Sequence, residues 1–365
     1  MLPSSTFSSD AHVTSRRWWT FGAVVVLLLA TVEFALRFPV VRSSLPPRTH
    51  YYHPAITTRL DAIERIADDQ ERVDVLFIGS SIVLTNVHPR VFDDVVGEPG
   101  RLVSFNLGLP GLWPTSVHLY AEHLWLPSGR PRLVVQGIRY PELATRSHAK
   151  HETQVWTGTI EPSWRESDLW TQLSAAVVSN VYLLQYRGAA TRVLERYRNG
   201  WSTPGEFDWH HAYEKRGYEP ILDADARPMD EWEADLPNEG VCEQPRCDVG
   251  FAALRRTIAA VRGVGGDYIL LNVPEHPSRW RGPEGLLRYR HYLEQLRAFA
   301  AAEGVEFVDP TGGDPFRFEA TPYADFAHMT EAGARQFTRS VALQMGSLVT
   351  ARVIRAGAAA RRSRG

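Results

Sequence analysis

The sequence predicts an α/β protein built on a parallel sheet that helices cover on both faces. Five short apolar runs recur along the chain, and segments with helical spacing separate them. The chain has 365 residues, of which 44% are hydrophobic, and this is ample for one large α/β domain with an insertion. Strands that alternate with helices in this way are typical of a parallel sheet.

The expected strands are the apolar runs, which cover 73–78, 102–106, 133–136, 268–272 and 306–308. The expected helices lie at 89–96, 115–125, 250–263, 283–303 and 330–347, and apolar residues also recur with helical spacing over 57–70. Right-handed crossovers between successive parallel strands then fix most of the topology.

An apolar segment at 18–38 stands apart from this pattern, because it is close to the length of about 20 residues that a helix needs to cross a bilayer. Glu33 and Arg37 interrupt it near its C-terminal end, where such side chains can reach the headgroups. A cleaved signal peptide is the alternative. Cleavage after Ala35 would place Glu33 where a small residue is required, so we expect an uncleaved transmembrane anchor.

The rest of the chain divides into one main domain and its flanking segments. Between about 145 and 249 the strand and helix alternation breaks, and we expect an insertion there. The sequence thus predicts an N-terminal tail at 1–17, a linker at 39–54, a domain at 55–348 and a basic tail at 349–365.

Cysteine usage bears on the compartment, because the chain has two cysteines, Cys242 and Cys247. Their spacing suits a small disulfide loop, which favours an oxidising compartment. Two free thiols in a loop are the alternative. We expect a single-pass protein of the cell membrane whose main domain lies outside the cytoplasm, although the arginines on both sides of the apolar segment leave its orientation open.

Charge and motifs exclude several classes of function. The formal net charge is −2, with 40 Lys and Arg against 42 Asp and Glu, so no basic excess indicates a nucleic-acid partner. A glycine-rich stretch at 263–266 precedes a strand, whereas a dinucleotide fingerprint must follow one. The sequence contains no phosphate-binding loop and no metal-site motif, so we expect neither a cofactor nor a metal.

Two motifs indicate acyl-group chemistry. Gly79-Ser80-Ser81 follows the first strand, and Asp325 and His328 form an Asp-x-x-His motif near the C-terminus. A serine at a strand-to-loop turn, a histidine base and an acid that orients the base make up a serine nucleophile site. Each motif also has a simple structural explanation, as a turn and as a helix cap. Their positions at the carboxyl ends of strands, where ligands bind in open α/β sheets, favour the catalytic explanation.

Two further polar residues, Asn272 and His276, follow the fourth strand at the same edge of the sheet. We expect them to contact the substrate. The prolines beside His276 equally suggest a rigid structural turn.

These motifs resemble those of the SGNH (GDSL-type) hydrolase superfamily over about residues 70–345. The resemblance implies a flavodoxin-like, three-layer fold, with Ser81 as the nucleophile and Asp325 and His328 completing the triad. It assigns the oxyanion hole to the backbone N–H groups of Ser81 and of Gly111, which ends an Asn-x-x-x-x-Gly block. The oxyanion asparagine of the family is missing, and Arg139 occupies its place. Arg139 could supply a third oxyanion donor, bind an anionic acceptor, or pair with a carboxylate such as Glu142.

This departure and the predicted anchor resemble membrane-anchored relatives, the alginate acetyltransferases and the D-alanine transfer protein of teichoic acid synthesis. The resemblance implies a serine esterase or O-acyltransferase that acts on acyl esters, acetyl above all, of a cell-envelope polysaccharide. It also implies a polymer acceptor and a membrane-bound protein that donates the acyl group. A plain esterase that uses water is one alternative, and a degenerate scaffold without activity is another.

Overall fold

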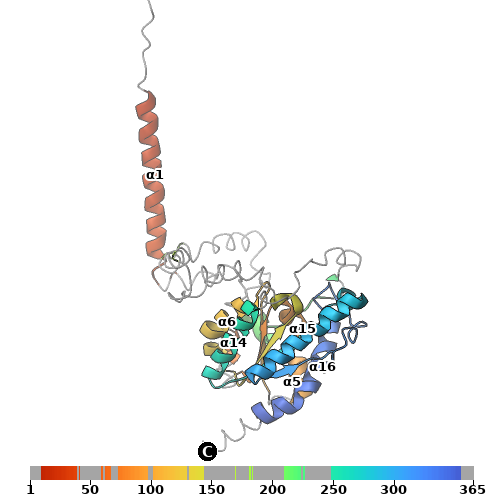
Figure 1. Cartoon of the computed structure of the whole chain (residues 1–365). Coiled ribbons are helices and arrows are strands. Elements are labelled where there is room, and N and C mark those ends of the chain that lie inside the picture. Colours follow the sequence, from red (N-terminus) through yellow and green to blue (C-terminus); the bar gives the residue numbers. More distant parts are fainter. Residues whose placement is uncertain are drawn as a thin grey trace, which may run out of the picture. The chain divides into compact units, whose positions relative to one another are not determined.

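The computed structural model describes residues 10–38, 41, 59–60, 62–66, 73–97, 102–129, 131–143, 169, 181, 183, 209–222, 225–226 and 248–354. The chain forms two compact units, residues 1–51 with 161–203 and residues 52–160 with 204–365. The first unit contains the long helix α1 and the second contains the sheet (Figure 1).

The helices and strands follow one another along the chain in an alternating order. They are α1 (Asp10–Ala35), β1 (Val75–Gly79), α4 (Ser81–Asn86), α5 (Pro89–Val96), β2 (Ser104–Gly108), α6 (Pro114–Tyr120), η1 (Ala121–Trp125), α7 (Leu126–Gly129), β3 (Leu133–Ile138), η2 (Tyr140–Leu143), α12 (Trp209–Glu214), α14 (Asp248–Gly263), β4 (Asp267–Asn272), η5 (Pro277–Trp280), α15 (Gly282–Glu303), β5 (Glu306–Val308), α16 (Glu331–Val349) and η6 (Thr350–Ile354).

The five strands form one parallel sheet with the order β2-β1-β3-β4-β5. This is the strand order of flavodoxin-like sheets, in which the connections run outward in both directions from the first strand. The predicted α/β fold class and all five predicted strands are therefore confirmed. The short helix α4 was not predicted, because six residues are too few to show a helical period.

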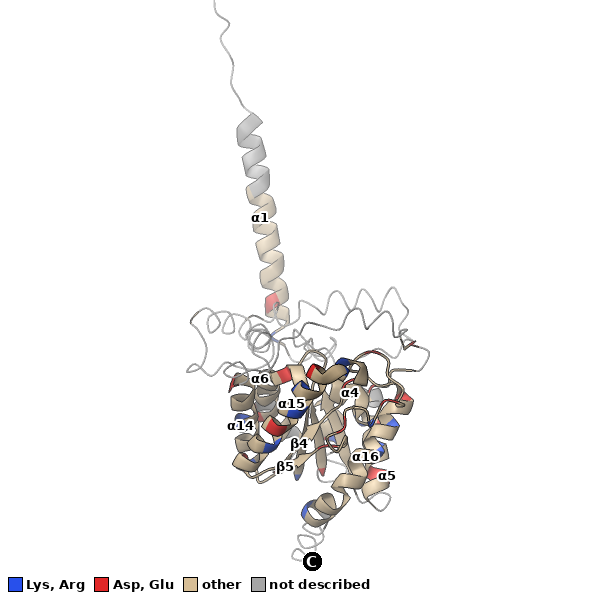
Figure 2. Ribbon diagram, turned by 45° about the vertical axis from the view of Figure 1, so that its right-hand side comes forward, with Lys and Arg blue, Asp and Glu red and all other residues tan. Residues whose placement is uncertain are grey.

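Successive residues of β1, β3 and β4 contribute to two separate cores, one on each face of the sheet. On β1, Leu76 and Ile78 point into the core beneath α6, α14 and α15, whereas Val75 and Phe77 point into the core beneath α4, α5 and α16. Figure 2 shows α14 and α6 on one side of the sheet and α16 and α5 on the other. The strands read as continuous apolar runs because both of their faces are buried.

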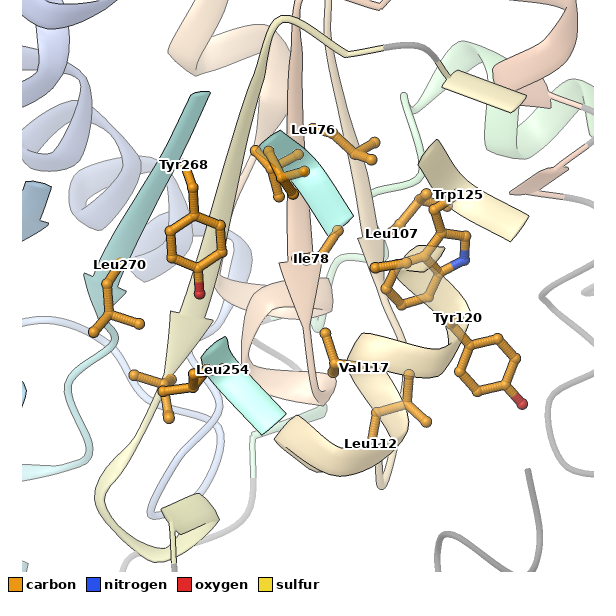
Figure 3. Packing of buried hydrophobic residues seen from close by; sticks show 14 of the residues in the cluster. Leu76, Ile78, Leu107, Leu112, Val117, Tyr120, Trp125, Leu254, Tyr268 and Leu270 are labelled. Carbon is orange, nitrogen blue, oxygen red and sulfur yellow. The ribbon is translucent and has the colours of Figure 1, made fainter. Parts of the chain in front are cut away.

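The first of these cores is rich in large side chains. Figure 3 shows the strand residues Leu76, Ile78 and Leu107 packed with Val117 and Trp125 from the helices. These side chains are at most 1% exposed. Truncating one such residue to alanine typically destabilises a domain by about 2–5 kcal/mol, so this layer holds the sheet and its strand ends in place.

Helix α1 contains most of the predicted anchor. The described large apolar side chains along it, between Trp19 and Phe34, are 37–79% exposed. Glu33 accepts a hydrogen bond from the N–H of Leu183 within the same unit. Across the described residues, no helix combines the length and the apolar character that crossing a membrane requires. Cys242 and Cys247, and with them the predicted disulfide, lie outside the described residues.

Candidate active site

The serine turn, Gly79-Ser80-Ser81, joins β1 to α4. Gly79 has a φ of +152°, and a Cβ there would lie 2.8 Å from the carbonyl oxygen of Gly137 on the neighbouring strand, so this position favours glycine. Ser80 caps α4, because its side chain accepts a hydrogen bond from the N–H of Ile82. Ser81 is the first residue of α4, and its side chain is half-buried.

The Asp-x-x-His loop precedes α16 and is closed by a single antiparallel bridge between Tyr323 and Met329. Within it, Oδ1 of Asp325 accepts hydrogen bonds from the N–H groups of Ala327 and His328, each at 2.8 Å. These bonds fix the backbone between the acid and the histidine, so the two side chains are held in one local unit.

The structure brings Ser81, His328 and Asp325 together. His328 Nε2 lies 2.7 Å from Ser81 Oγ, and His328 Nδ1 lies 2.8 Å from Asp325 Oδ2. An ionised carboxylate can only accept, so Nδ1 carries the ring proton and Nε2 of the neutral ring accepts from the Ser81 hydroxyl. The His328 side chain is 23% exposed, which leaves the pair open to an incoming ester.

Asp325 is ionised in this arrangement. Burial by itself raises the pKa of Asp325. The hydrogen bond and electrostatic interaction with His328, together with the N–H groups of Ala327 and His328, outweigh burial and lower that pKa to about 2. The carboxylate therefore stays negative across the neutral pH range and can stabilise an imidazolium on His328.

Asn86, at the end of α4, is a site residue that sequence reasoning missed. It is fully buried, its Nδ2 donates to the carbonyl of Ala327 at 2.9 Å, and its Oδ1 accepts from the N–H of Met329 at 2.8 Å. The two bonds flank His328 and fasten its loop to the helix that begins with Ser81. No local motif marks this residue, because its partners lie more than 240 positions away.

The motif resemblance assigns two backbone N–H groups, those of Ser81 and Gly111, to an oxyanion hole. Among the described residues, neither the N–H of Ser81 nor that of Gly111 has a hydrogen-bond acceptor. Gly111 lies in the turn after β2 with a φ of +70°, and this turn is tied to the serine turn because the N–H of Leu109 donates to the carbonyl of Gly79 at 3.1 Å. These two donors are the ones that the family resemblance assigns to the oxyanion hole.

Arg139 is engaged with carboxylates in the structure. Its Nη1 donates to Glu275 Oε1 at 2.8 Å, and its Nε lies 3.4 Å from Glu142 Oε1. Its guanidinium also lies over the ring of Phe326 in the Asp-x-x-His loop, 5.7 Å from the ring centroid. Of the three roles considered from the sequence, pairing with a carboxylate is the one that these contacts display.

Asn272 lies in a buried polar network below the strand end. Its Nδ2 donates to Asp309 Oδ1 at 3.0 Å and to the Tyr289 hydroxyl at 3.2 Å, and its Oδ1 accepts from the Tyr292 hydroxyl at 3.3 Å. With 1% exposure, it anchors β4 to α15 and to the turn after β5. The structure gives it no hydrogen bond to the Ser81–His328 pair within the described part of the chain.

His276 shapes the turn after β4. Its Nδ1 lies 2.8 Å from the hydroxyl of Ser278, and its ring packs edge-on against Tyr323. Its backbone N–H donates to the carbonyl of Phe326 at 2.8 Å, which joins this turn to the Asp-x-x-His loop. These contacts match the rigid-turn alternative that the neighbouring prolines suggested.

Side chains of the metal-ligating types are not gathered into a site in the described part of the structure. Over the described ranges, no group of three or more His, Cys, Asp or Glu side chains is arranged to hold a metal ion. Asp325 and His328 are hydrogen-bonded to one another, with Nδ1 2.8 Å from Oδ2.

Comparisons with known proteins identify no family for this chain. No family model matches the sequence, and no curated protein matches it. Among solved structures, a GDSL-like lipase from Bacteroides thetaiotaomicron is similar at 12% identity and a TM-score of 0.36, over 79% of this chain and 98% of that one. An acetylxylan esterase from Geobacillus stearothermophilus is similar at 14% identity and a TM-score of 0.36, over 75% of this chain and 94% of that one.

Proposed function

We propose that this protein is a serine enzyme of the SGNH type that cleaves or transfers an acyl group, with Ser81 as nucleophile, His328 as general base and Asp325 as the acid that orients it. One observation carries the proposal, the 2.7 Å contact between Ser81 Oγ and His328 Nε2 on a histidine whose other nitrogen meets Asp325 at 2.8 Å. This is the hydrogen-bond chain that activates a serine hydroxyl.

In the first half-reaction, Ser81 Oγ bonds to the acyl carbon while its proton moves to His328 Nε2. The carbonyl oxygen becomes an oxyanion that the N–H groups of Ser81 and Gly111 can stabilise. Losing one such donor typically costs about 2.7–4 kcal/mol of transition-state stabilisation. The bond to the leaving oxygen then breaks, and His328 returns the proton to it, which leaves an acyl-Ser81 ester and a free alcohol.

In the second half-reaction, the oxygen of a hydroxyl compound bonds to the acyl carbon of acyl-Ser81 while His328 takes its proton. The bond between the acyl carbon and Ser81 Oγ then breaks, and His328 returns the proton to Oγ. Water as the attacking group gives hydrolysis, and a sugar hydroxyl gives transfer. The partial exposure of His328 supports access for either acceptor. We propose acetyl as the acyl group and an envelope polysaccharide as the acceptor, on the strength of the motif resemblance.

We further propose that the segment 18–38 attaches the enzyme to the cell membrane, with the sheet domain on the outer side and a membrane protein supplying the acyl group. The apolar sequence and the exposed apolar side chains of α1 support attachment. Membrane fractionation of the full chain, beside a chain that begins after residue 38, tests this part. Retention of the shorter chain in the membrane fraction, or release of the full chain by salt alone, would contradict it.

The catalytic proposal is tested with a chromogenic acetyl ester and a fluorophosphonate probe. The full chain is expected to hydrolyse the ester and to react covalently with the probe, and the Ser81→Ala variant is expected to do neither. Ser80→Ala removes the adjacent hydroxyl and leaves the nucleophile in place, so it is expected to keep the covalent reaction with the probe, at a reduced rate. Equal ester hydrolysis by wild type and Ser81→Ala would refute the proposal. A folded wild type that is inert to both reagents would favour a scaffold without activity.

A further inference from the structure

A cluster of polar and charged side chains that contains two buried carboxyl groups adjoins the serine turn through Ser80 and has no part in the reaction steps above. It consists of Ser80, Arg139, Glu142, Glu275 and Arg279, which we call the strand-end cluster. Its side chains come from the segments that follow β1, β3 and β4. Glu142 and Glu275 are 3% and 2% exposed, so two carboxylates lie in the interior close to the nucleophile.

Ser80 is the link between this cluster and the nucleophile. Its Oγ donates a short hydrogen bond of 2.5 Å to Glu142 Oε1, and the same oxygen accepts from the N–H of Ile82 as the cap of α4. One peptide bond separates Ser80 from Ser81. Glu142 therefore holds the side chain of the residue that directly precedes Ser81 and caps its helix.

Glu142 is itself held by the surrounding arginine network. Arg139 donates its backbone N–H to Glu142 Oε2 at 3.4 Å, while its guanidinium bridges to Glu275 at 2.8 Å. Arg279 also binds Glu275, with Nη1 donating to Oε1 at 3.2 Å and Nε 3.2 Å from Oε2. Glu142 thus sits at a fixed point between the segments after β3 and β4, and Arg139 extends the network to the ring of Phe326 in the Asp-x-x-His loop.

The position of Glu142 is energetically demanding. Burial raises the pKa of Glu142 to about 7, although Arg139 and the Ser80 hydroxyl act in the opposite direction. A buried ion pair is weak evidence for stability, because a well-packed apolar residue is often equally stable or more stable at such a place. A cap needs the Ser80 oxygen as an acceptor and does not need a buried carboxylate behind it. Fold stability and capping therefore leave Glu142 unexplained.

We propose that Glu142 is a positioning residue for the nucleophile, which acts through the Ser80 hydroxyl to aim Ser81 at His328. The inference rests on the proposed function. It predicts that the carboxylate acts by accepting the Ser80 hydrogen bond. A neutral acceptor of the same shape should then substitute for it, and an apolar side chain of similar size should not.

The test compares Glu142→Gln with Glu142→Leu in the full chain, using the chromogenic acetyl ester. Glu142→Leu is expected to lower kcat by about 10-fold to 100-fold with little change in KM, because a misplacement of about 1 Å can reduce a rate by about 100-fold. Glu142→Gln keeps an acceptor for Ser80 and is expected to restore most of kcat. Ser80→Ala combined with Glu142→Leu should lose no more than the larger single loss, since both changes remove one contact.

Asp93→Asn is the matched control for neutralising a buried carboxylate. Burial raises the pKa of Asp93 to about 7, as it does for Glu142, and Asp93 Oδ2 accepts from the N–H of Ser104 at 3.2 Å. Ser104 begins β2, at the opposite end of the strands from Ser81. Asp93→Asn is therefore expected to change stability and to leave kcat unchanged.

Three results would overturn the inference while the proposed function stands. They are a folded Glu142→Leu protein with wild-type kcat, equal losses of kcat in Glu142→Gln and Glu142→Leu, and additive losses of kcat when Ser80→Ala and Glu142→Leu are combined. A wild-type protein that neither hydrolyses the ester nor reacts with the fluorophosphonate would overturn the proposed function, and this inference with it. The Ser81→Ala variant in the same assay separates the two cases.

Discussion

Replacing Asn86 by alanine is expected to loosen the loop that carries His328. The change removes the bond to the carbonyl of Ala327 at 2.9 Å and the bond from the N–H of Met329 at 2.8 Å, both of them buried. Leaving a buried polar group without a partner costs about 1–3 kcal/mol, so two groups predict a loss of about 2–6 kcal/mol in the free energy of unfolding. That is a large part of the 5–15 kcal/mol typical of a folded domain.

Urea unfolding followed by circular dichroism measures this loss, and ester hydrolysis measures its effect on the site. Thr338→Val is the matched control, because Thr338 donates to the backbone carbonyl of Asn86 at 3.2 Å and accepts from the N–H of His88, but does not touch the loop. Both variants should be less stable, and only Asn86→Ala should also lose kcat. An Asn86→Ala protein as stable as wild type, or one with the kcat of Thr338→Val, would refute this reasoning.

Two further predictions follow from the site and from the buried carboxyls. Asp325→Asn should lower kcat by about 10⁴-fold with little change in KM, because the amide no longer holds His328 in the tautomer that accepts a proton. Steady-state kinetics measure the loss, and a loss below tenfold would contradict this prediction. Burial raises the pKa of Glu142 and of Asp93 to about 7, so the folded state keeps protons that the unfolded state loses near pH 4. The free energy of unfolding should therefore fall as pH rises from about 4 to 7, by roughly 3 kcal/mol for Glu142 and roughly 4 kcal/mol for Asp93. Urea unfolding midpoints measure this fall, which should be smaller in Asp93→Asn than in wild type, and an equal fall in the two proteins would count against the prediction.

The fold was predictable because burial on both faces leaves a plain trace in the sequence. Residues 75–78 are all buried, two toward each core, and the run reads as continuously apolar. The same holds for β3 and β4. Helix α4 left no such trace, because its start is set by the Ser80 cap and its six residues complete less than two turns.

The candidate site was predictable only where its parts are local. The serine turn and the Asp-x-x-His loop are contiguous motifs, and the sheet order brings them to one edge. Asn86 and Glu142 act across separations of 241 and 62 positions, so only the folded chain reveals their partners. The pairing of Arg139 with Glu275 likewise joins two strand-end loops, and the sequence could not select it among the three roles considered.

The most direct measurement of the central claim is to trap the acyl-enzyme. The full chain is mixed with an acetyl ester, quenched in acid and digested, and the acetylated residue is located by fragment mass spectrometry. The account predicts acetyl on Ser81 and none on Ser80, with the adduct absent in His328→Ala. Ester hydrolysis without an adduct on Ser81, or an adduct on Ser80, would contradict the assignment of the nucleophile.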